Sequence, residues 1–231
     1  MKVLFISLGC DKNLVDSEVM LGLLSRHGYE FTDDEEEAEA VVINTCCFIS
    51  DAKEESVNTI LDMAERRKNG QLQALLVTGC LAQRYSEEMQ VEIPEVDAVL
   101  GTTAIDAIAD ALDEVLKGQQ HNYIEDINKA PQGGRHRVVT TGGYYAYLKI
   151  AEGCDKHCTY CIIPKVRGDY RSVPMEQLLK EAKELAEGGV KELILVAQET
   201  TLYGKDIYGE KKLPELLKKL VMEAPDAIKW L

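Results

Sequence analysis

The sequence has 231 residues, of which 45% are hydrophobic and 29% charged, and its formal net charge is −14. This balance is typical of a globular protein with one large or two modest domains. No stretch approaches the ~20 apolar residues of a membrane-spanning helix, and no signal peptide precedes the first strand, so we expect a cytoplasmic protein without a membrane partner. Seven cysteines without an export signal favour a reducing compartment and metal chemistry over disulfides.

The excess of acidic residues is confined to the first part of the chain. Residues 1–143 hold 12 Lys and Arg against 26 Asp and Glu, whereas residues 144–231 hold 14 of each. Surfaces that bind nucleic acids are usually basic, so the acidic part favours a basic protein as partner. The alternative is that the acidity only keeps the protein soluble.

The first part of the chain alternates apolar, β-rich runs with amphipathic stretches. We expect strands over 3–9, 29–32, 40–45, 74–78 and 98–100, and helices over 14–26, 51–68, 81–90 and 105–116. Alternating βα units predict an α/β fold, here an open parallel, doubly wound sheet with helices on both faces, as the domain 1–118. The sheet carries no Gly-x-Gly-x-x-Gly turn, which argues against a dinucleotide site.

Three of the cysteines, Cys10, Cys46 and Cys80, each close one of the predicted strands. The carboxyl ends of parallel strands meet at one edge of a sheet, where open α/β proteins bind ligands. Three thiols at that edge suggest an iron–sulfur cluster with one iron unligated. The alternative is that they are buried and unreactive, a common fate of cysteine. Cys47 follows Cys46 directly, so its side chain points the opposite way in extended backbone, and we predict that it is not a ligand.

Residues 119–143 are polar and rich in turn-forming residues, and we expect a linker there. The domain 144–231 then begins with a predicted strand over 144–151. Further elements are predicted along it: a helix over 175–187, a strand over 192–197, a helix over 214–222 and the start of a third strand at 228–231.

The second set of cysteines, Cys154, Cys158 and Cys161, follows the first strand of this domain with the spacing Cys-x3-Cys-x2-Cys. Three such thiols can hold three corners of a [4Fe–4S] cube and leave the fourth iron open to bind and activate a small molecule. A zinc site would need a fourth ligand, for which His157 is available, although we expect that residue to be solvated. A disulfide is disfavoured, because three thiols lie within eight residues and nothing marks the chain as secreted.

The spacing of this second set resembles the signature of the radical S-adenosylmethionine (SAM) enzymes. In that family the open iron is chelated by SAM, and one-electron reduction gives a 5'-deoxyadenosyl radical. With the stretches 7–18, 44–46, 78–80 and 152–169, the whole chain resembles the methylthiotransferases, which place a methylthio group on an unactivated carbon. The resemblance implies an N-terminal cluster domain, followed by the first βα units of a radical SAM, TIM-like partial barrel.

The resemblance also implies cofactors and site residues: two [4Fe–4S] clusters and S-adenosyl-L-methionine. The metal ligands would be Cys10, Cys46 and Cys80 for an auxiliary cluster, and Cys154, Cys158 and Cys161 for the SAM-cleaving cluster. Tyr160 would lie against the adenine of SAM. Gln198, Glu199 and Thr200 end a barrel strand, where they bind SAM or substrate or only close the strand into a loop. Arg167 is a cation near the cluster, which pairs with a carboxylate of SAM or of an acidic substrate, or is simply solvated.

The family has two branches, one that modifies adenosine in tRNA and one that modifies an aspartate of the twelfth small-subunit ribosomal protein. The stretches 12–18, 46–49 and 198–204 resemble the ribosomal-protein branch, although that branch usually has Gly where Cys47 stands. We therefore expect a methylthiotransferase acting on the β-carbon of an aspartate in a basic ribosomal protein, with flavodoxin or ferredoxin as reductant. The alternatives are a tRNA adenosine methylthiotransferase, an iron–sulfur electron carrier and an inactive cluster-binding fragment.

Two βα units and the start of a third strand are too few to close a barrel. Members of the family continue with more βα units and an RNA-binding-type β-barrel. We therefore expect the 231 residues to be the N-terminal part of a longer protein or a truncated product.

Overall fold

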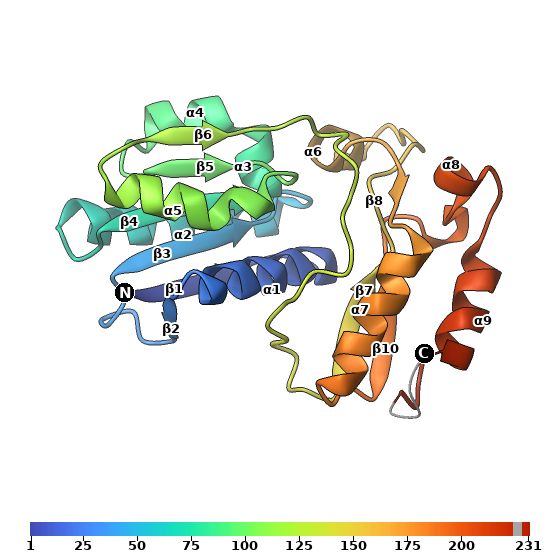
Figure 1. The fold of residues 1–231 in the computed structure, drawn as a ribbon. Helices are drawn as coiled ribbons and strands as arrows, with labels where there is room; N and C mark the ends of the chain where they lie inside the picture. Colours follow the sequence, from blue (N-terminus) through green and yellow to red (C-terminus); the bar gives the residue numbers. More distant parts are fainter. Residues whose placement is uncertain (224–227) are drawn as a thin grey trace. The chain divides into compact units, whose positions relative to one another are not determined.

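The computed structural model describes residues 1–223 and 228–231, and the chain divides into two compact units, residues 1–127 and 128–231 (Figure 1). The division falls within residues 119–143, where the sequence predicts a linker. The first unit contains β1 (Lys2–Ser7), α1 (Asp11–Arg26), β2 (Glu30–Thr32), β3 (Ala40–Thr45), α2 (Ser50–Lys68), β4 (Ala74–Gly79), α3 (Cys80–Arg84), α4 (Ser86–Glu92), β5 (Ala98–Leu100), the 3-10 turn η1 (Ile105–Ala107), α5 (Ile108–Leu116) and β6 (His121–Tyr123).

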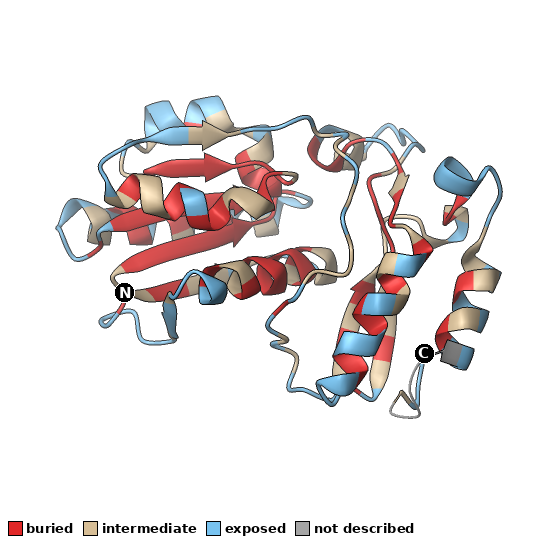
Figure 2. Cartoon of the chain, in the orientation of Figure 1, coloured by how far each residue is buried: buried red, intermediate tan, exposed pale blue. Residues whose placement is uncertain are grey.

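The first unit is built on a six-stranded sheet of order β2-β1-β3-β4-β5-β6, in which every neighbouring pair is parallel. All residues of the central strands β3 and β4 are buried, as is typical of a parallel sheet with both faces covered (Figure 2). Alternate strand residues, among them Val42 and Leu76, pack with α1 and α5 in one core, while α2 contacts β3 and β4. The predicted doubly wound α/β fold is therefore confirmed.

Three details of the first unit differ from the sequence-based expectation. The helix expected over 81–90 is divided into α3 and α4 at Tyr85, whose φ of −126° and ψ of 31° are not helical. The helix expected over 105–116 begins as the 3-10 turn η1. Residues His121–Tyr123, placed in the predicted linker, form the edge strand β6, which pairs with β5 at one end of the sheet. An edge strand of polar residues lacks the apolar run by which the buried strands are predicted.

The second unit contains two parallel strands, each followed by helices. It contains β7 (Tyr145–Lys149), β8 (Ala151–Glu152), α6 (Ile163–Arg167), β9 (Arg171–Ser172), α7 (Met175–Glu187), β10 (Glu192–Val196), the 3-10 turn η2 (Thr200–Leu202), α8 (Lys205–Tyr208) and α9 (Leu213–Glu223). β7 and β10 are parallel neighbours, and β8 pairs antiparallel with β9. Trp230 forms a parallel bridge with Glu192, which agrees with the strand predicted to start at 228–231. Side chains of α7 and α9 pack with those of β7 and β10 in a separate core.

Among the described residues, no helix combines the length and the apolar character that crossing a bilayer requires.

Candidate functional site

The first set of cysteines lies at one edge of the six-stranded sheet. Cys10, Cys46 and Cys80 follow β1, β3 and β4, which are parallel neighbours, so all three lie at the carboxyl edge as predicted. Cys46 and Cys80 are buried and Cys10 is exposed. A Cβ placed on Gly9 would lie 3.1 Å from the Cys46 Sγ, so the turn before Cys10 runs directly against Cys46. The Cys80 Sγ lies 3.8 Å from the Asn13 Oδ1.

A buried network of amide side chains holds the turns that carry these cysteines. The Asn13 Nδ2 donates to the carbonyls of Leu8 at 3.1 Å and Thr45 at 3.0 Å, which ties the start of α1 to the ends of β1 and β3. The Asn44 Nδ2 donates to the Asn13 carbonyl and to the Ser17 Oγ, both at 2.9 Å. Both asparagines are almost completely buried, so an unmatched partner there would be costly. Neither asparagine is predicted from the sequence to have a role; the available signal was a polar residue beside each strand end.

Cys46 and Cys47 are fixed in different ways. The Ser56 Oγ of α2 accepts the Cys46 N–H and donates to the Cys46 carbonyl, both at 3.0 Å. The Cys47 thiol donates to the Cys80 carbonyl at 3.3 Å. Burial raises the pKa of the Cys47 thiol to about 11, so this thiol is protonated at neutral pH. That Cys47 is not a ligand stays a prediction.

The second set of cysteines lies on the loop between β8 and α6. The Cys154 N–H donates to the Gly168 carbonyl at 3.1 Å, and the Cys161 N–H donates to the Cys158 carbonyl at 2.9 Å. Cys158 is exposed, and Cys154 and Cys161 are half-buried. The thiols are therefore accessible on a loop whose backbone is anchored.

The start and the end of this cysteine loop are in direct contact. Gly153 has a φ of +78°, and a Cβ on it would lie only 2.0 Å from the Asp169 carbonyl oxygen. The Asp155 Oδ1 accepts the Tyr170 N–H at 2.6 Å. Between them, exposed His157 takes a φ of +45°, in the left-handed region, and turns the chain between the first two cysteines. At position 153 only glycine fits, because any larger residue would clash with the Asp169 carbonyl oxygen.

Glu152, immediately before the cysteine loop, is the centre of a buried polar cluster that the sequence analysis missed. Its Oε2 accepts from the Lys149 Nζ at 2.9 Å and from the Arg167 Nη1 at 3.1 Å, and its Oε1 accepts from the Gln198 Nε2 at 2.8 Å. Burial by itself raises the pKa of the Glu152 carboxyl, but the Arg167 and Lys149 cations outweigh it and hold that pKa below its usual value. The carboxylate is therefore ionised. The signal for it was a single acidic residue at the end of an apolar strand.

Two residues expected to bind SAM or substrate belong to this cluster. Arg167 is only 2% exposed and is paired with Glu152, so it is neither solvated nor directed to the surface. Gln198 gives its Nε2 to Glu152, while its Oε1 is buried without a hydrogen-bond partner among the described residues. An unpaired buried acceptor is a place where a donor on a ligand would be stabilised.

The other expected residues are Glu199, Thr200 and Tyr160. The Glu199 carboxylate pairs with Lys156 of the cysteine loop and accepts the Thr201 N–H at 3.1 Å. The hydrogen bond from Lys156 is the main cause that lowers the pKa of Glu199. Thr200 begins η2 directly after it. The ring of Tyr160 is 88% exposed and so is available to a ligand.

Both cysteine sets fit an iron–sulfur cluster by the chemistry of their donors. Each offers three thiols, the soft ligands that iron–sulfur centres select, and leaves one corner of a cube without a protein ligand. Within residues 1–223 and 228–231, no three His, Cys, Asp or Glu side chains are gathered closely enough to hold a metal ion. The structure thus places each trio at one edge or on one loop without closing it around a common point.

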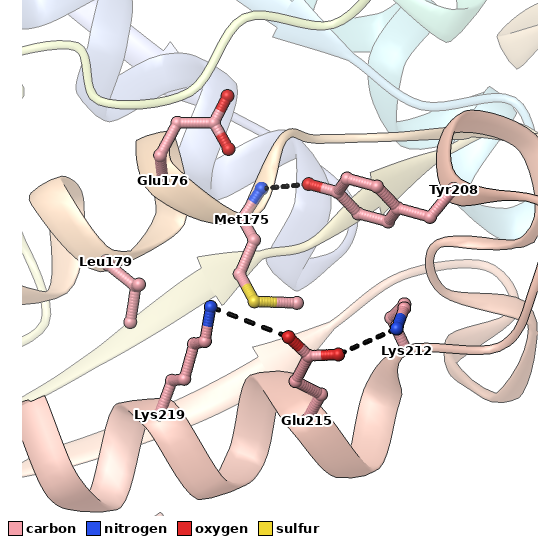
Figure 3. A pocket seen from close by; sticks show the side chains of 7 residues that line it. All are labelled: Met175, Glu176, Leu179, Tyr208, Lys212, Glu215 and Lys219. Atoms are coloured by element: carbon pink, nitrogen blue, oxygen red, sulfur yellow. Dashed lines mark hydrogen bonds and ion pairs between the residues drawn. The ribbon is translucent and has the colours of Figure 1, made fainter.

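A pocket of about 200 Å³ between α7, α8 and α9 lies apart from these residues (Figure 3). Three of its charged side chains are paired with one another, since Glu215 lies 2.9 Å from the Lys212 Nζ and 3.5 Å from the Lys219 Nζ. The Tyr208 hydroxyl accepts the Met175 N–H at 2.8 Å. None of the predicted site residues lines this pocket.

Comparison with known proteins finds matches for both units of the chain. A family model described as Radical SAM superfamily matches residues 148–228, and one described as Uncharacterized protein family UPF0004 matches residues 2–101. The ribosomal protein uS12 methylthiotransferase RimO of Lachnoclostridium phytofermentans is 66% identical over all 231 residues of this chain. Over its whole length the chain is therefore similar to a radical SAM methylthiotransferase.

Other relatives in the methylthiotransferase family carry the same name. The RimO proteins of Clostridioides difficile and Clostridium tetani are 51% and 52% identical, over 100% and 98% of this chain. These alignments cover 52% and 50% of the two relatives, and the Lachnoclostridium alignment covers 52%. The chain therefore spans about half the length of the curated relatives that it matches.

A solved structure supports the fold of this chain. The radical S-adenosylmethionine methyltransferase TsrM from Kitasatospora setae, solved with cobalamin and a [4Fe-4S] cluster, matches with a TM-score of 0.62 at 12% identity. The match covers 99% of this chain and 53% of TsrM. At this identity it is an argument about the fold alone, and it confirms the fold class predicted from the sequence.

Proposed function

We propose that this protein acts as a radical SAM methylthiotransferase that places a methylthio group on the β-carbon of an aspartate in ribosomal protein uS12. The observation that carries the proposal is the 66% identity, over all 231 residues, with a protein named uS12 methylthiotransferase. The charge of the chain is consistent with a basic protein substrate, because the excess acid lies within residues 1–143. The cytoplasm is the compartment we propose, since none of the seven cysteines forms a disulfide in the part of the chain that the structure describes.

The proposed cofactors are two [4Fe–4S] clusters and SAM. Cys10, Cys46 and Cys80 would hold one cluster at the carboxyl edge of the sheet. The loop cysteines Cys154, Cys158 and Cys161 would hold the other. When bound, the second cluster passes one electron to SAM, which supplies the radical that removes hydrogen from the substrate carbon. An external one-electron donor such as flavodoxin or ferredoxin is part of the proposal.

The residues around the cysteine loop have proposed binding roles. The exposed ring of Tyr160 would cover the adenine of SAM with its flat face. The free Oε1 of Gln198 would accept a hydrogen bond from the same ligand. Glu199 and Thr200 lie next along the strand end and would contact SAM or substrate. Arg167 would support the site indirectly and not contact the ligand, because its side chain is buried and its charge is paired with Glu152.

The first experiment is anaerobic reconstitution followed by iron and sulfide counts. The wild type should hold about eight irons, and alanine replacement of either cysteine trio should leave about four. If the wild type holds about four and replacement of the loop cysteines removes none, the second cluster is not formed and the radical SAM proposal fails for this chain.

Substrate identity is then decided by product analysis. The reconstituted protein, SAM and a reductant are incubated in parallel with uS12 and with tRNA, and the products are examined by mass spectrometry. A methylthio group on an aspartate of uS12 is the expected product. Modified adenosine in tRNA would replace the proposed substrate, and absence of SAM cleavage would refute the enzymatic function in favour of an electron carrier or a cluster-binding fragment.

A further inference from the structure

Three segments of the second unit meet at one carboxylate. Lys149 ends β7, Arg167 ends α6 where the chain leaves the cysteine loop, and Gln198 follows β10. All three donate to Glu152, which is 7% exposed. Glu152 is therefore the acceptor that these three segments have in common.

The contact with Gln198 determines the orientation of its amide. The Gln198 Nε2 donates to the Glu152 Oε1 at 2.8 Å, so the amide nitrogen of Gln198 faces Glu152. Its oxygen then faces away, buried and without a partner among the described residues. A neutral residue in place of Glu152 would allow the amide to turn, which would present a donor instead of an acceptor to any ligand.

If Glu152 served only to pair with the buried Arg167, its second carboxylate oxygen would not need to bind Gln198. The Arg167 and Lys149 contacts both use the Oε2 of Glu152, and the Oε1 is left to Gln198. The same two segments are linked a second time where Lys156 of the loop, 59% exposed, pairs with Glu199, 9% exposed. Solvent screens this pair at its Lys156 end, whereas both side chains of the Glu152–Arg167 pair are buried.

We propose that Glu152 is a positioning residue that couples the cysteine loop, through Arg167, to the end of β10, through Gln198. This coupling orients the Gln198 Oε1 as a hydrogen-bond acceptor for the ligand that binds at the loop. Taking that ligand to be SAM rests on the proposed function. The coupling of the loop to the strand end does not, because it concerns the chain without cofactors.

The first test measures hydrogen exchange in the full chain without cluster or SAM. Glu152→Gln should speed exchange in both residues 153–170 and residues 197–200 by about tenfold, equivalent to ~1.4 kcal/mol. Gln198→Met, which keeps the Arg167 pair, should speed exchange at 197–200 and leave the loop unchanged. Glu192→Gln, at the opposite end of β10, is the matched control and should change neither. Unchanged exchange at 197–200 in Glu152→Gln would overturn the coupling.

The second test measures binding of SAM to the reconstituted chain by calorimetry, beside its iron content. A positioning role predicts that Glu152→Gln and Gln198→Met keep the iron content of the wild type and bind SAM about tenfold more weakly. Equal affinity would leave Glu152 with a structural role only and would refute the inference about the ligand. If the wild type loads iron and does not bind SAM, the proposed function fails, while the exchange experiment still decides the coupling.

Discussion

Individual glycines determine how closely the chain packs around the first cysteine set. Gly79 directly precedes Cys80 and has a φ of +93°. A Cβ on it would lie 2.3 Å from the Asn44 Oδ1 and 2.5 Å from the Thr45 carbonyl oxygen. Backbone and a buried amide cannot move aside as a flexible side-chain end can, so the position requires glycine for space as well as for conformation.

The substitution Gly79→Ala tests this directly. We expect it to lower the free energy of unfolding by roughly 3 kcal/mol or more, because steric displacement adds to the cost of a positive φ. Gly70→Ala is the matched control, since Gly70 has a φ of +75° and nothing within 4 Å of the added Cβ. It should cost only about 1–2 kcal/mol. Urea unfolding measures both, and equal losses would contradict the steric argument.

At the scale of elements, the segment before β7 is docked on α7. The Gly133 N–H donates to the Gln177 Oε1 at 2.8 Å, and the Gly134 N–H donates to the Glu181 Oε2 at 3.1 Å. The Arg137 Nε lies 3.5 Å from the Glu181 Oε1, and both side chains are buried. Part of the segment for which the sequence predicts a linker is thus fixed to the second unit by polar contacts.

Glu181 gives this contact a defined pH dependence. Burial raises the pKa of Glu181, against the opposing effects of Arg137, the Gly134 N–H and Lys149, while Glu184 raises it further. A carboxyl with a raised folded-state pKa contributes stability below its unfolded pKa of about 4.3 and loses it as pH rises through the folded value. The unfolding free energy of the wild type should therefore fall relative to that of Glu181→Gln as pH rises above about 4.3. Urea unfolding from pH 4 to 7 checks this, and a constant difference between the proteins would contradict it.

The start of α7 depends on a tyrosine from another element. The hydroxyl of Tyr208 in α8 accepts the Met175 N–H, one of the N-terminal amides that a helix cannot satisfy itself (Figure 3). Tyr208→Phe should lower the free energy of unfolding by about 1 kcal/mol, the usual cost of such a cap. Tyr160→Phe removes a hydroxyl from a side chain that is 88% exposed and should have no measurable effect. Thermal unfolding of the two variants compares them, and similar shifts would argue against the capping role.

The sequence predicts the elements that are long and apolar, and it fails where tertiary contacts decide. β3 and β4 are uninterrupted apolar runs, and the predicted edge position of the first cysteine set follows from them and is confirmed. α6, β9 and α8 have two to five residues each and carry no periodicity that would distinguish them. The Glu152 cluster was equally invisible, because its members are separated in sequence and are joined only by the fold. Arg167 could therefore be recognised as a cation near the loop but not as the partner of Glu152.

At the scale of the whole molecule, the acidic surface has local partners. Glu35 and Glu36 each lie 2.9 Å from Arg66, and Glu37 pairs with Lys2 at 2.6 Å. The acidic run 33–37 is therefore partly neutralised within the first unit. Attraction of a basic substrate would arise from the summed charge of residues 1–143 and would weaken with added salt.

The two units have separate cores, so they should respond separately to substitution. The core of the first unit is formed by side chains between Met1 and Tyr123, and that of the second by side chains between Val139 and Ile228. Gly79→Ala should lower only the unfolding temperature of the first unit, and Tyr208→Phe only that of the second, by roughly 4–8 °C per kcal/mol for domains of this size. Hydrogen exchange, measured during thermal unfolding on peptides from residues 1–127 and 128–231, gives the unfolding temperature of each unit separately. A single transition that both substitutions shift equally would show that the units unfold as one cooperative block, and the distinct cores would then not define independent domains.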